Sequence, residues 1–591
     1  MGVELPWPAV VKIIQAIDTQ VHPATRSARL ESWFPWILFA AAIFVLFFQL
    51  GRAALFEPDE GRNAEKAREI LVLNDWITPH ENFHPVLDKP IFLYWLIALS
   101  YQRFGISEWA ARLPSALAAL GGLAVLYGFV RMHWGSWPAL WAGLILLTSL
   151  EFFVLARVVI FDMPLTFFLT VVLCAFYEAG HSDDIRRRRW LCLLLYGALG
   201  AAMLIKGLIG IVLPGMVIFC YLLLSKQWSI LRRIYLFPGI LLFLAIVLPW
   251  YLQIDARNDG YLKYYFWDEH FGRYATVNFD RSQPWYYFFL VLLAGFFPWT
   301  LLLPFVLAHY RRKTFDDQTL FLILWAVLPF LFFSFSKSKL PHYILPIFPA
   351  LAILTAVALV QKLSEPTAKI RSALHGTWIA EGLLVLYFVV GAIQPAILPQ
   401  AIRTGVVNMA DHLWLYGVLM VLVPVLLRFS QMSETLPSQP LRFITQTFST
   451  ILFLLFVAEL MVAAAPFRSA KDIASKAATT ITPMTQLVFY DTYLAGMAFY
   501  LRTEQPIWMI THGKKKRTFL GNYYALSNRA EPVTRWGKAL LDFDEFARRW
   551  QTAKQPMVIF ARQRNLAHLA EQVGETPRPV AAFDEYVALA K

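Results

Sequence analysis

The sequence predicts a polytopic α-helical membrane protein with about thirteen transmembrane helices and a small C-terminal α/β domain. Of the 591 residues, 58% are hydrophobic and 16% are charged, which is more apolar material than one soluble core can hold. Long apolar stretches recur from Trp33 to about Ala465, and only helices or closed barrels satisfy their backbone in lipid. From Pro466 onward the composition is mixed, with ordinary charge density, as in a small soluble domain.

The distribution of Lys and Arg predicts the orientation of the chain. The formal net charge is +13, but much of the excess lies in short loops between apolar stretches, where it indicates topology and not a nucleic-acid partner. With residues 1–32 in the cytoplasm, basic residues fall in every predicted inner loop. Residues 33–465 then form the transmembrane domain, and residues 466–591 form a domain on the outer face.

Residues 57–90 form the most polar, charge-mixed segment in the first half of the chain, and we interpret them as an active-site loop with interfacial helices. Pro58 suits a helix start, and acids suit its first turn. Apolar residues follow at helical spacing, so one face should lie on an apolar surface, although an ordinary surface amphipathic helix would look similar. The side chains that we expect in water are Asp59, Arg62, Lys66 and Glu69.

Residues 91–104 are apolar but shorter than the roughly 20 residues that a span requires, so we place them at the membrane interface. A second large outer loop is expected at residues 255–284. In the C-terminal domain the sequence favours strands at 486–490, 506–510 and 556–560 and helices at 542–552 and 565–573, a pattern typical of a small α/β unit.

Acidic residues on the outer face are candidates for catalysis. Asp59 and Asp162 come from different outer loops, each at the mouth of a span, and Glu60 stands beside Asp59. Carboxylates in such positions suit general-base catalysis or cation binding. For Asp162 the alternative is a helix cap, since Pro164 follows in the expected first turn.

Cations gather at the same level. Lys89 follows Asp88 where the first loop re-enters the membrane, and Lys337 and Lys339 precede Tyr343 at another such point. Cations with aromatic neighbours at this depth are what a lipid phosphate requires, and also what interfacial anchoring supplies. The sequence therefore predicts a phosphate site, with anchoring as the alternative.

The second outer loop mixes aromatic residues with Glu269, His270 and Arg273. Such residues often line sugar or head-group pockets, although an interfacial aromatic belt has the same composition. His270 with Asp88 or Glu269 could hold a metal, but the spacing carries no ligand signature. A divalent metal therefore stays open, and no cofactor is predicted with certainty.

Taken together in order, these pieces resemble the membrane glycosyltransferases of the GT-C superfamily. The resemblance is closest to the lipid A aminoarabinose transferases and their protein O-mannosyltransferase relatives, and it covers most of the membrane part. The pieces that carry it are Asp59-Glu60-x-Arg62, Asp88-Lys89-Pro90, Ala111-Arg112-Leu113-Pro114, Asp162-Met163-Pro164, Lys206-Gly207, Glu269-His270-Phe271-x-Arg273, Pro298-Trp299 and Lys337-x-Lys339-Leu340-Pro341-x-Tyr343.

The resemblance implies a transferase that takes a sugar from a polyprenyl-phosphate carrier at the outer face of the bacterial inner membrane. The implied acceptor is lipid A phosphate, with a protein or another glycan as the alternative. Asp59 matches the family's catalytic carboxylate and Asp162 its second acid. The residues implied to hold the donor phosphate or the acceptor are Arg62, Lys89, Arg273, Lys337 and Lys339, supported by Glu60, Asp88, Glu269, His270 and Tyr343.

Two positions depart from the family pattern. Asp88 stands where glutamate is usual, and Ile91 follows Pro90 where proline is usual. These departures bear on the sugar and the acceptor more than on the reaction. A lipid transporter or flippase is the remote alternative, but transporters usually place ionisable residues near the midplane and show internal repeats, which this sequence does not.

Overall fold

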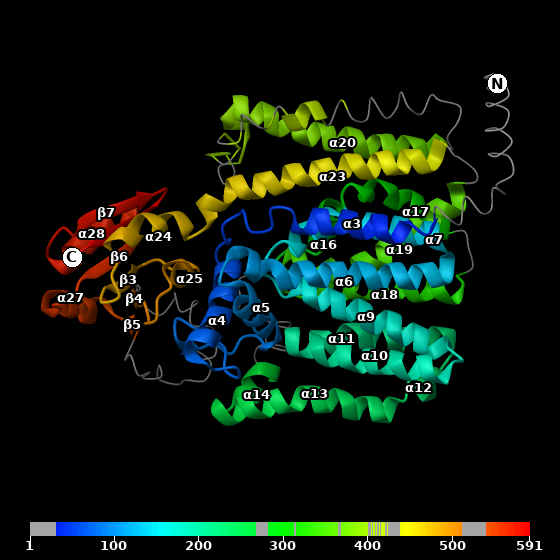
Figure 1. Cartoon of the computed structure of the whole chain (residues 1–591), viewed down its shortest axis with the longest axis horizontal. Coiled ribbons are helices and arrows are strands. Elements are labelled where there is room, and N and C mark those ends of the chain that lie inside the picture. The colour runs from blue at the N-terminus through cyan, green and yellow to red at the C-terminus, as the bar shows by residue number, and fades with distance from the viewer. Residues whose placement is uncertain are drawn as a thin grey trace, which may run out of the picture.

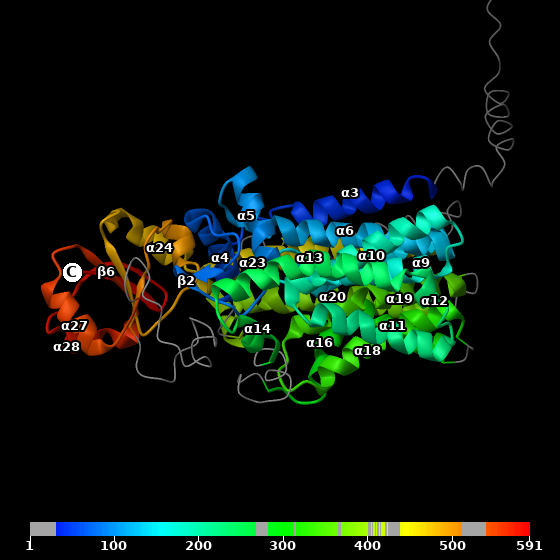
Figure 2. The same ribbon diagram turned by 90° about the horizontal axis from the view of Figure 1, so that it is seen from below.

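The computed structural model describes residues 31–267, 282–311, 315–363, 368–399, parts of 403–422, 438–510 and 539–591. Long helices run side by side to form a bundle, and an α/β unit lies beyond one end of it (Figures 1 and 2). Between the bundle and this unit lie helices α4 (Asp59–Leu73) and α5 (Phe92–Phe104). The end of the bundle that carries α4 is called the α4 end below.

The described residues contain eight helices that are long and apolar enough to cross a membrane, or up to ten if each of two bent pairs is one span. This confirms a multi-pass helical membrane protein. The number thirteen stays a prediction, because most of residues 400–437 lie outside the described part of the chain. The eight candidate spans are Glu108–Trp134, Asp162–His181, Ile185–Lys206, Leu236–Arg257, Asp317–Phe335, Pro341–Gln361, Leu374–Ile393 and Phe443–Arg468.

These spans belong to helices whose bounds the sequence explains locally. Ser107 and Asp184 accept hydrogen bonds from the backbone N–H groups of Ala110 and Arg186, and so cap α6 and α10. The helices of the bundle are α3 (Phe34–Phe47), α6 (Glu108–Trp134), α7 (Ser136–Leu147), α8 (Leu150–Ala156), α9 (Asp162–His181), α10 (Ile185–Lys206), α11 (Ile209–Ser225), α12 (Ile230–Arg233), α13 (Leu236–Arg257), α14 (Tyr261–Lys263), α16 (Tyr287–Gly295), η2 (Trp299–Leu302), α17 (Leu303–Tyr310), α18 (Asp317–Phe335), η3 (Pro341–Ile347), α19 (Phe348–Leu363), α20 (Ala368–Ile393), η4 (Pro395–Ile397) and α23 (Ser438–Ala464).

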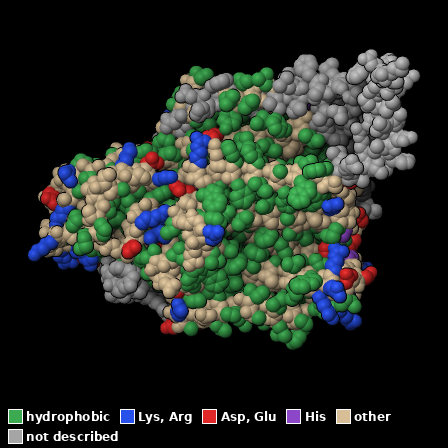
Figure 3. Space-filling view, viewed as in Figure 1, with side chains coloured by type: hydrophobic (Ala, Val, Ile, Leu, Met, Phe, Trp, Pro, Cys, Tyr) green, Lys and Arg blue, Asp and Glu red, His purple; other side chains and the backbone are tan. Residues whose placement is uncertain are grey.

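The surface of the bundle is largely apolar. Figure 3 shows hydrophobic side chains across the face of the bundle, with Lys and Arg gathered near its two ends and on the α/β unit. Large side chains such as Phe219, Leu252 and Leu307 are exposed on it. A soluble protein of this size does not expose such an apolar band, whereas a bilayer covers it.

The α/β unit is built on a six-stranded sheet of order β5-β4-β3-β6-β8-β7, in which β5, β4, β3 and β6 are parallel and β8 and β7 are antiparallel. Alternate residues of β3 face opposite sides, so Leu487 and Phe489 pack in one core and Val488 and Tyr490 in another. Its elements are η5 (Ala465–Arg468), α24 (Lys471–Ala477), η6 (Ala478–Thr480), β3 (Gln486–Tyr490), α25 (Met497–Leu501), β4 (Trp508–Ile510), β5 (Leu540–Leu541), α27 (Phe543–Thr552), β6 (Met557–Arg562), η8 (Gln563–Asn565), α28 (Leu566–Val573), β7 (Arg578–Phe583) and β8 (Tyr586–Ala590).

Helix α4 departs from the expectation that its polar face lies in water. Lys66 is 1% exposed and Glu69 is fully buried, although Asp59 is exposed and Arg62 partly so. The helix is enclosed because the bundle, the hairpin of β1 (His80–Glu81) and β2 (His84–Pro85), and α25 surround it. Buried charges are costly unless they are paired, so this position requires partners for them.

Candidate functional site

Asp59 is the first residue of α4, and its side chain is exposed at the helix N-terminus. The partial positive charge at that end of the helix favours a carboxylate there. The Arg62 guanidinium is close enough for the two charges to interact. Asp59 is thus a carboxyl group that remains accessible to solvent, at the start of a helix whose other acidic side chains are buried.

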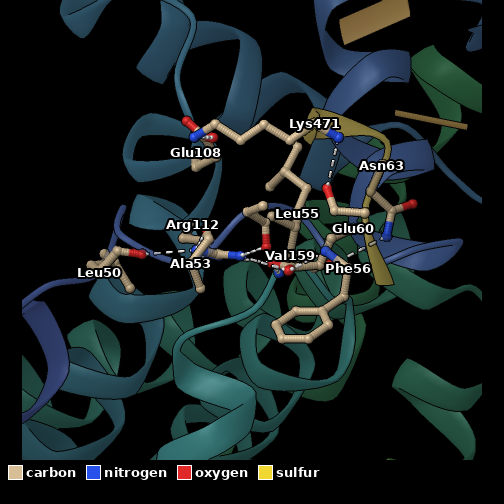
Figure 4. Close-up of polar contacts among 12 residues, drawn as sticks. Leu50, Ala53, Leu55, Phe56, Glu60, Asn63, Glu108, Arg112, Val159 and Lys471 are labelled. Atoms are coloured by element: carbon tan, nitrogen blue, oxygen red, sulfur yellow. Dashed lines mark hydrogen bonds and ion pairs between the residues drawn. The ribbon is translucent and has the colours of Figure 1, made fainter. Parts of the chain in front are cut away.

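Glu60, the neighbour of Asp59, connects α4 to the bundle through both of its carboxylate oxygens (Figure 4). The guanidinium of Arg112 on α6 donates Nε to Glu60 Oε1 at 2.9 Å and Nη2 to Oε2 at 2.7 Å, and both residues are buried. The carboxylate also accepts from the backbone N–H groups of Phe56 and Val159. The remaining Arg112 donors bind the carbonyl oxygens of Leu50, Ala53 and Ala54. Glu60 therefore supports the site by fixing the start of α4.

A second set of charges lies on the next turns of α4. Arg62 Nε is 3.1 Å from Glu81 Oε1, and Lys66 Nζ is 3.4 Å from Glu81 Oε2 and 3.0 Å from Asp88 Oδ1. The hydroxyl of Tyr493, from the α/β unit, donates to the same Glu81 Oε1 at 2.7 Å. Two predicted site residues, Arg62 and Asp88, are thus joined through Lys66 and Glu81.

The charges in this set are mutually stabilised. Glu81 is the main reason that the pKa of Arg62 is raised above its usual value. Burial opposes the charged form of Lys66, but Asp88 and Glu81 overcome it and hold the pKa of Lys66 above its usual value. Burial likewise opposes ionisation of Asp88, yet Lys66 and Lys89 keep its pKa well below the usual range. All three groups are therefore charged at neutral pH.

Lys89 and Pro90 lead from this set into α5. The Lys89 side chain is partly buried, and its Nζ donates to the carbonyl oxygen of Asp88 at 3.1 Å. It is near enough to the Asp88 carboxylate to lower the pKa of that group. Lys89 therefore places a cation where the first loop leads into α5.

The second predicted acid, Asp162, is buried at the first residue of α9. Its Oδ1 lies 2.5 Å from Nζ of Lys206, the last residue of α10, and its Oδ2 lies 3.6 Å from His342 Nε2. Lys206 Nζ also lies 4.9 Å from the centre of the Tyr343 ring. An acid at a helix N-terminus and a cation at a helix C-terminus are each favoured by the helix dipole. Tyr343 thus belongs to the Asp162 cluster.

The turn after α18 places its two lysines differently. Lys337 is exposed, whereas Lys339 is largely buried and donates to the carbonyl oxygen of Gln283 at 3.0 Å. Burial lowers the pKa of Lys339. Ser338 forms a β-bridge with Ser282, so this turn holds the end of the second large loop.

Three predicted residues, Glu269, His270 and Arg273, lie outside the described residues, so the suggested metal site of His270 with Asp88 or Glu269 is not tested. Within the described ranges no group of three or more His, Cys, Asp or Glu side chains is placed to hold a metal ion. A metal at this site therefore stays an open expectation.

The α/β unit takes part in the site, which the sequence did not predict. Glu57 accepts from the backbone N–H groups of Ala495 at 3.0 Å and Gly496 at 2.7 Å. Asn82 exchanges two hydrogen bonds with the backbone of Ile507, at 2.8 and 2.9 Å. Burial raises the pKa of Glu57 to about 8, although these two N–H groups oppose the change.

Residues that the sequence analysis missed share one property. They are polar side chains whose partners lie far away along the chain, as Glu81 lies far from Tyr493, and Arg112 from Glu60. The one available signal was the cost of Arg or Lys beside apolar helices, which indicates a partner without naming it. Lys206 was singled out in the sequence as part of the Lys206-Gly207 motif, without Asp162 as its partner.

Comparison with known proteins gives a consistent set of relatives. The sequence pattern of the dolichyl-phosphate-mannose-protein mannosyltransferase family matches residues 88–252. Over 347 residues the chain is 33% identical to the undecaprenyl phosphate-alpha-4-amino-4-deoxy-L-arabinose arabinosyl transferase of Edwardsiella ictaluri, an alignment covering 58% of this chain and 61% of that protein. The chain therefore spans less than two thirds of that relative's length.

The alignment with a second relative covers a larger share of that relative's length. The protein of the same description from Pseudomonas savastanoi pv. phaseolicola is 34% identical over 360 residues, which is 60% of this chain and 67% of that protein. The crystal structure of ArnT from Cupriavidus metallidurans bound to undecaprenyl phosphate matches with a TM-score of 0.78 and 29% identity, over 94% of this chain and 97% of that one. The similarity to this structure thus includes both the bundle and the α/β unit.

Proposed function

Because the chain belongs to the aminoarabinose transferase family of GT-C membrane glycosyltransferases, we propose that it transfers a sugar from a polyprenyl-phosphate carrier to an acceptor at the outer face of the membrane. The sugar is of the aminoarabinose type, and the acceptor is a phosphate of lipid A. The observation that carries this proposal is the match over almost the whole chain to a structure solved with undecaprenyl phosphate.

The proposed reaction is a displacement at the anomeric carbon of the sugar. An acceptor oxygen forms a bond to this carbon from one face while the bond to the carrier phosphate breaks on the other, and the phosphate leaves with the electron pair. Asp59, exposed at the start of α4, takes the proton of a hydroxyl acceptor or positions a phosphate acceptor that is already an anion. Asp162 is the second acid of the proposed site.

Cations near these acids stabilise the negative charge that grows on the leaving phosphate. The cations that we propose for this role are Arg62, Lys89, Lys337, Lys339 and Arg273. Arg62 and Lys89 lie at the α4 end, in or beside the set of ion pairs that Glu81 and Asp88 complete. Fixed charges of this kind speed the reaction when they bind the transition state more strongly than the substrate.

The orientation follows from the same assignment. We place the protein in the bacterial inner membrane, with residues 1–32 in the cytoplasm, residues 33–465 as the membrane domain of about thirteen helices, and residues 466–591 in the periplasm. In support, the basic loop that begins α10 is at the end of the bundle opposite α4 (Figure 1). The α4 end then faces the periplasm, where a lipid-linked donor replaces a nucleotide sugar.

A protein or another glycan is the alternative acceptor. The observation that favours it is the match of residues 88–252 to the mannosyltransferase family. The carrier chemistry and the role of Asp59 are the same in both cases, because both acceptors attack the same carbon. Lipid A is preferred because the relatives from Edwardsiella ictaluri and Pseudomonas savastanoi pv. phaseolicola carry the aminoarabinose description.

Mass spectrometry of lipid A tests the proposal. Cells that lack this gene are complemented with the wild type, with Asp59→Asn or with Asp544→Asn, in which the changed residue is an exposed Asp in the first turn of α27. We expect an aminopentose-sized mass increment with the wild type and Asp544→Asn, and its loss with Asp59→Asn at equal protein level. An unmodified lipid A in every strain would contradict lipid A as acceptor, and full activity of Asp59→Asn would contradict the assigned base.

A further inference from the structure

One carboxylate inside the bundle takes no part in the site described above. Glu151, in the first turn of α8, is 9% exposed, and neither of its carboxylate oxygens has a hydrogen-bond partner among the described residues. Buried polar groups are nearly always paired, and an ionisable side chain at membrane depth is costly. An unpaired one therefore indicates a partner that binds during function.

Another buried acid in the bundle shows what a structural role looks like. Glu381 on α20 is fully buried, and its carboxylate accepts from Thr450 at 2.7 Å, Ser449 at 2.8 Å and Gln446 at 3.3 Å on α23. These bonds satisfy the carboxylate within the protein. No described residue donates such hydrogen bonds to the Glu151 carboxylate. The two buried acids therefore differ in role.

Glu151 lies where two broken spans meet. The axis bends by 67° between α7 and α8, and by 107° between α16 and the segment that begins at Trp299. The two breaks are joined by hydrogen bonds from Leu150 N to Phe297 O and from Trp299 Nε1 to Thr148 Oγ1, each at 3.0 Å. Irregular backbone at membrane depth is typical of places where a polar ligand is bound.

Gly295, the last residue of α16, leaves the space that the Glu151 carboxylate occupies. A Cβ atom at position 295 would lie 2.2 Å from Glu151 Oε2, which is closer than atoms can approach. Any larger residue would therefore move the carboxylate. The Glu151 carboxylate is therefore packed against Gly295 of α16, without a hydrogen bond to any described residue.

The charges nearby show what the site lacks. Asp162 is close enough to Glu151 for their charges to interact, and α8 also contacts η3, which carries His342 and Tyr343. Asp162 is already balanced by Lys206. Among the residues that the structure describes, Glu151 has no such cation and is not in a group of three or more side chains placed to hold a metal ion. One organic cation with N–H donors would complete the site.

We propose that Glu151 binds the amino group of the sugar carried by the donor. This rests on the proposed function, because it names the part of the sugar that this carboxylate recognises. An ammonium group brings one positive charge and three donors to a carboxylate with two free oxygens. A sugar that has a hydroxyl in place of the amine lacks the charge. Glu151 is thereby a specificity-determining residue, distinct from Asp59, which acts on the acceptor, and from the cations that hold the phosphate.

Binding to the purified full-length protein separates this idea from the proposed function. Affinity is measured for undecaprenyl phosphate alone and for the same carrier loaded with aminoarabinose, using wild type, Glu151→Gln and Glu381→Gln. We expect Glu151→Gln to weaken binding of the loaded carrier about ten- to a hundredfold, the size of a lost bond to a charged group, and to leave the bare carrier unchanged. Glu381→Gln should change neither affinity.

Each other result decides a different question. Equal affinity of wild type and Glu151→Gln for the loaded carrier would overturn the inference. Equal weakening of both carriers would also overturn it, by assigning Glu151 a structural role. Failure of the wild type to bind either carrier would instead contradict the proposed function.

Gly295→Ala provides an independent check that keeps the charge. The added methyl group should displace the Glu151 carboxylate and weaken binding of the loaded carrier, again without effect on the bare carrier. In single turnovers, both variants should slow transfer of aminoarabinose more than transfer of a neutral pentose from the same carrier. No difference between the two sugars in either variant would contradict recognition of the amine.

Discussion

At the scale of single residues, the pair of Glu60 and Arg112 shows how Asp59, the proposed catalytic residue, is positioned. The pair is buried, bidentate and satisfied on every side by backbone groups. Because Glu60 follows Asp59 directly, fixing one carboxylate fixes the backbone that carries the other. Glu60 thus fixes the backbone position of Asp59 through contacts made within the protein.

Replacing Arg112 should therefore affect folding first. Arg112→Met leaves the buried Glu60 carboxylate unpaired, and breaking such a pair typically costs about 3–5 kcal/mol. We expect a large drop in the thermal unfolding midpoint of the purified protein. Arg112→Lys retains the charge but loses the bidentate contact, so its unfolding midpoint should lie between those of the wild type and Arg112→Met. An unchanged midpoint in Arg112→Met would show that the pair contributes little to stability.

At the scale of elements, α4 behaves as a shared core helix and not as a surface helix. Its N-terminal turn is held by α6, its middle by the β1–β2 hairpin, and its approach by the loop before α25. The last of these contacts is made by Glu57. Since its docked pKa is about 8, above the ordinary value of 4.5, docking takes up a proton.

The contact at Glu57 should accordingly depend on pH. Its contribution is complete below about pH 4.5 and is lost as the pH rises to about 8, because over this range the undocked carboxyl ionises while the docked one stays protonated. Glu57→Gln retains an acceptor and removes this titration. We expect the wild-type unfolding midpoint, relative to Glu57→Gln, to fall from about pH 4.5 to about pH 8 and then to level off. A constant difference over that range would show that Glu57 does not titrate in the docked state.

The sequence predicted much of this at the level of elements and less at the level of contacts. Apolar length correctly indicated a multi-pass helical membrane protein, and the strand expected at 486–490 agrees with the bounds of β3. The helical spacing in α4 was right, but Lys66 and Glu69 were wrongly placed in water. Periodicity reports which residues are apolar, whereas burial of Lys66 depends on Glu81 and Asp88, which other segments bring to it.

At the scale of the whole molecule, the α/β unit and the bundle are joined by hydrogen bonds and an ion pair as well as by apolar contacts. Asn82 holds the backbone of Ile507, Tyr500 accepts from Leu55 N at 2.8 Å, and Lys471 pairs with Glu108 at 2.7 Å. Such bonds are specific in position because each buried group needs its one partner. The unit is therefore held in one orientation over α4.

Loss of Asn82 should loosen this orientation. Asn82→Ala leaves the N–H and the carbonyl oxygen of Ile507 without partners, at a cost of about 1–3 kcal/mol for a buried group. We expect faster hydrogen exchange in β4 and in the β1–β2 hairpin, with the span α9 unchanged as an internal reference. Exchange that is unchanged in both segments would indicate that other contacts alone hold the unit.

The long separation between Glu81 and Tyr493 has a consequence for biosynthesis. A ribosome completes α4 and the hairpin more than 400 residues before it reaches Tyr493. Until then the charged helix lacks part of its cover, and the aspartate at its start lacks its final support. We therefore expect activity only after Tyr493 and the rest of the α/β unit have been made and have docked on α4, and a product truncated before Tyr493 should carry the residues of the proposed site without being active.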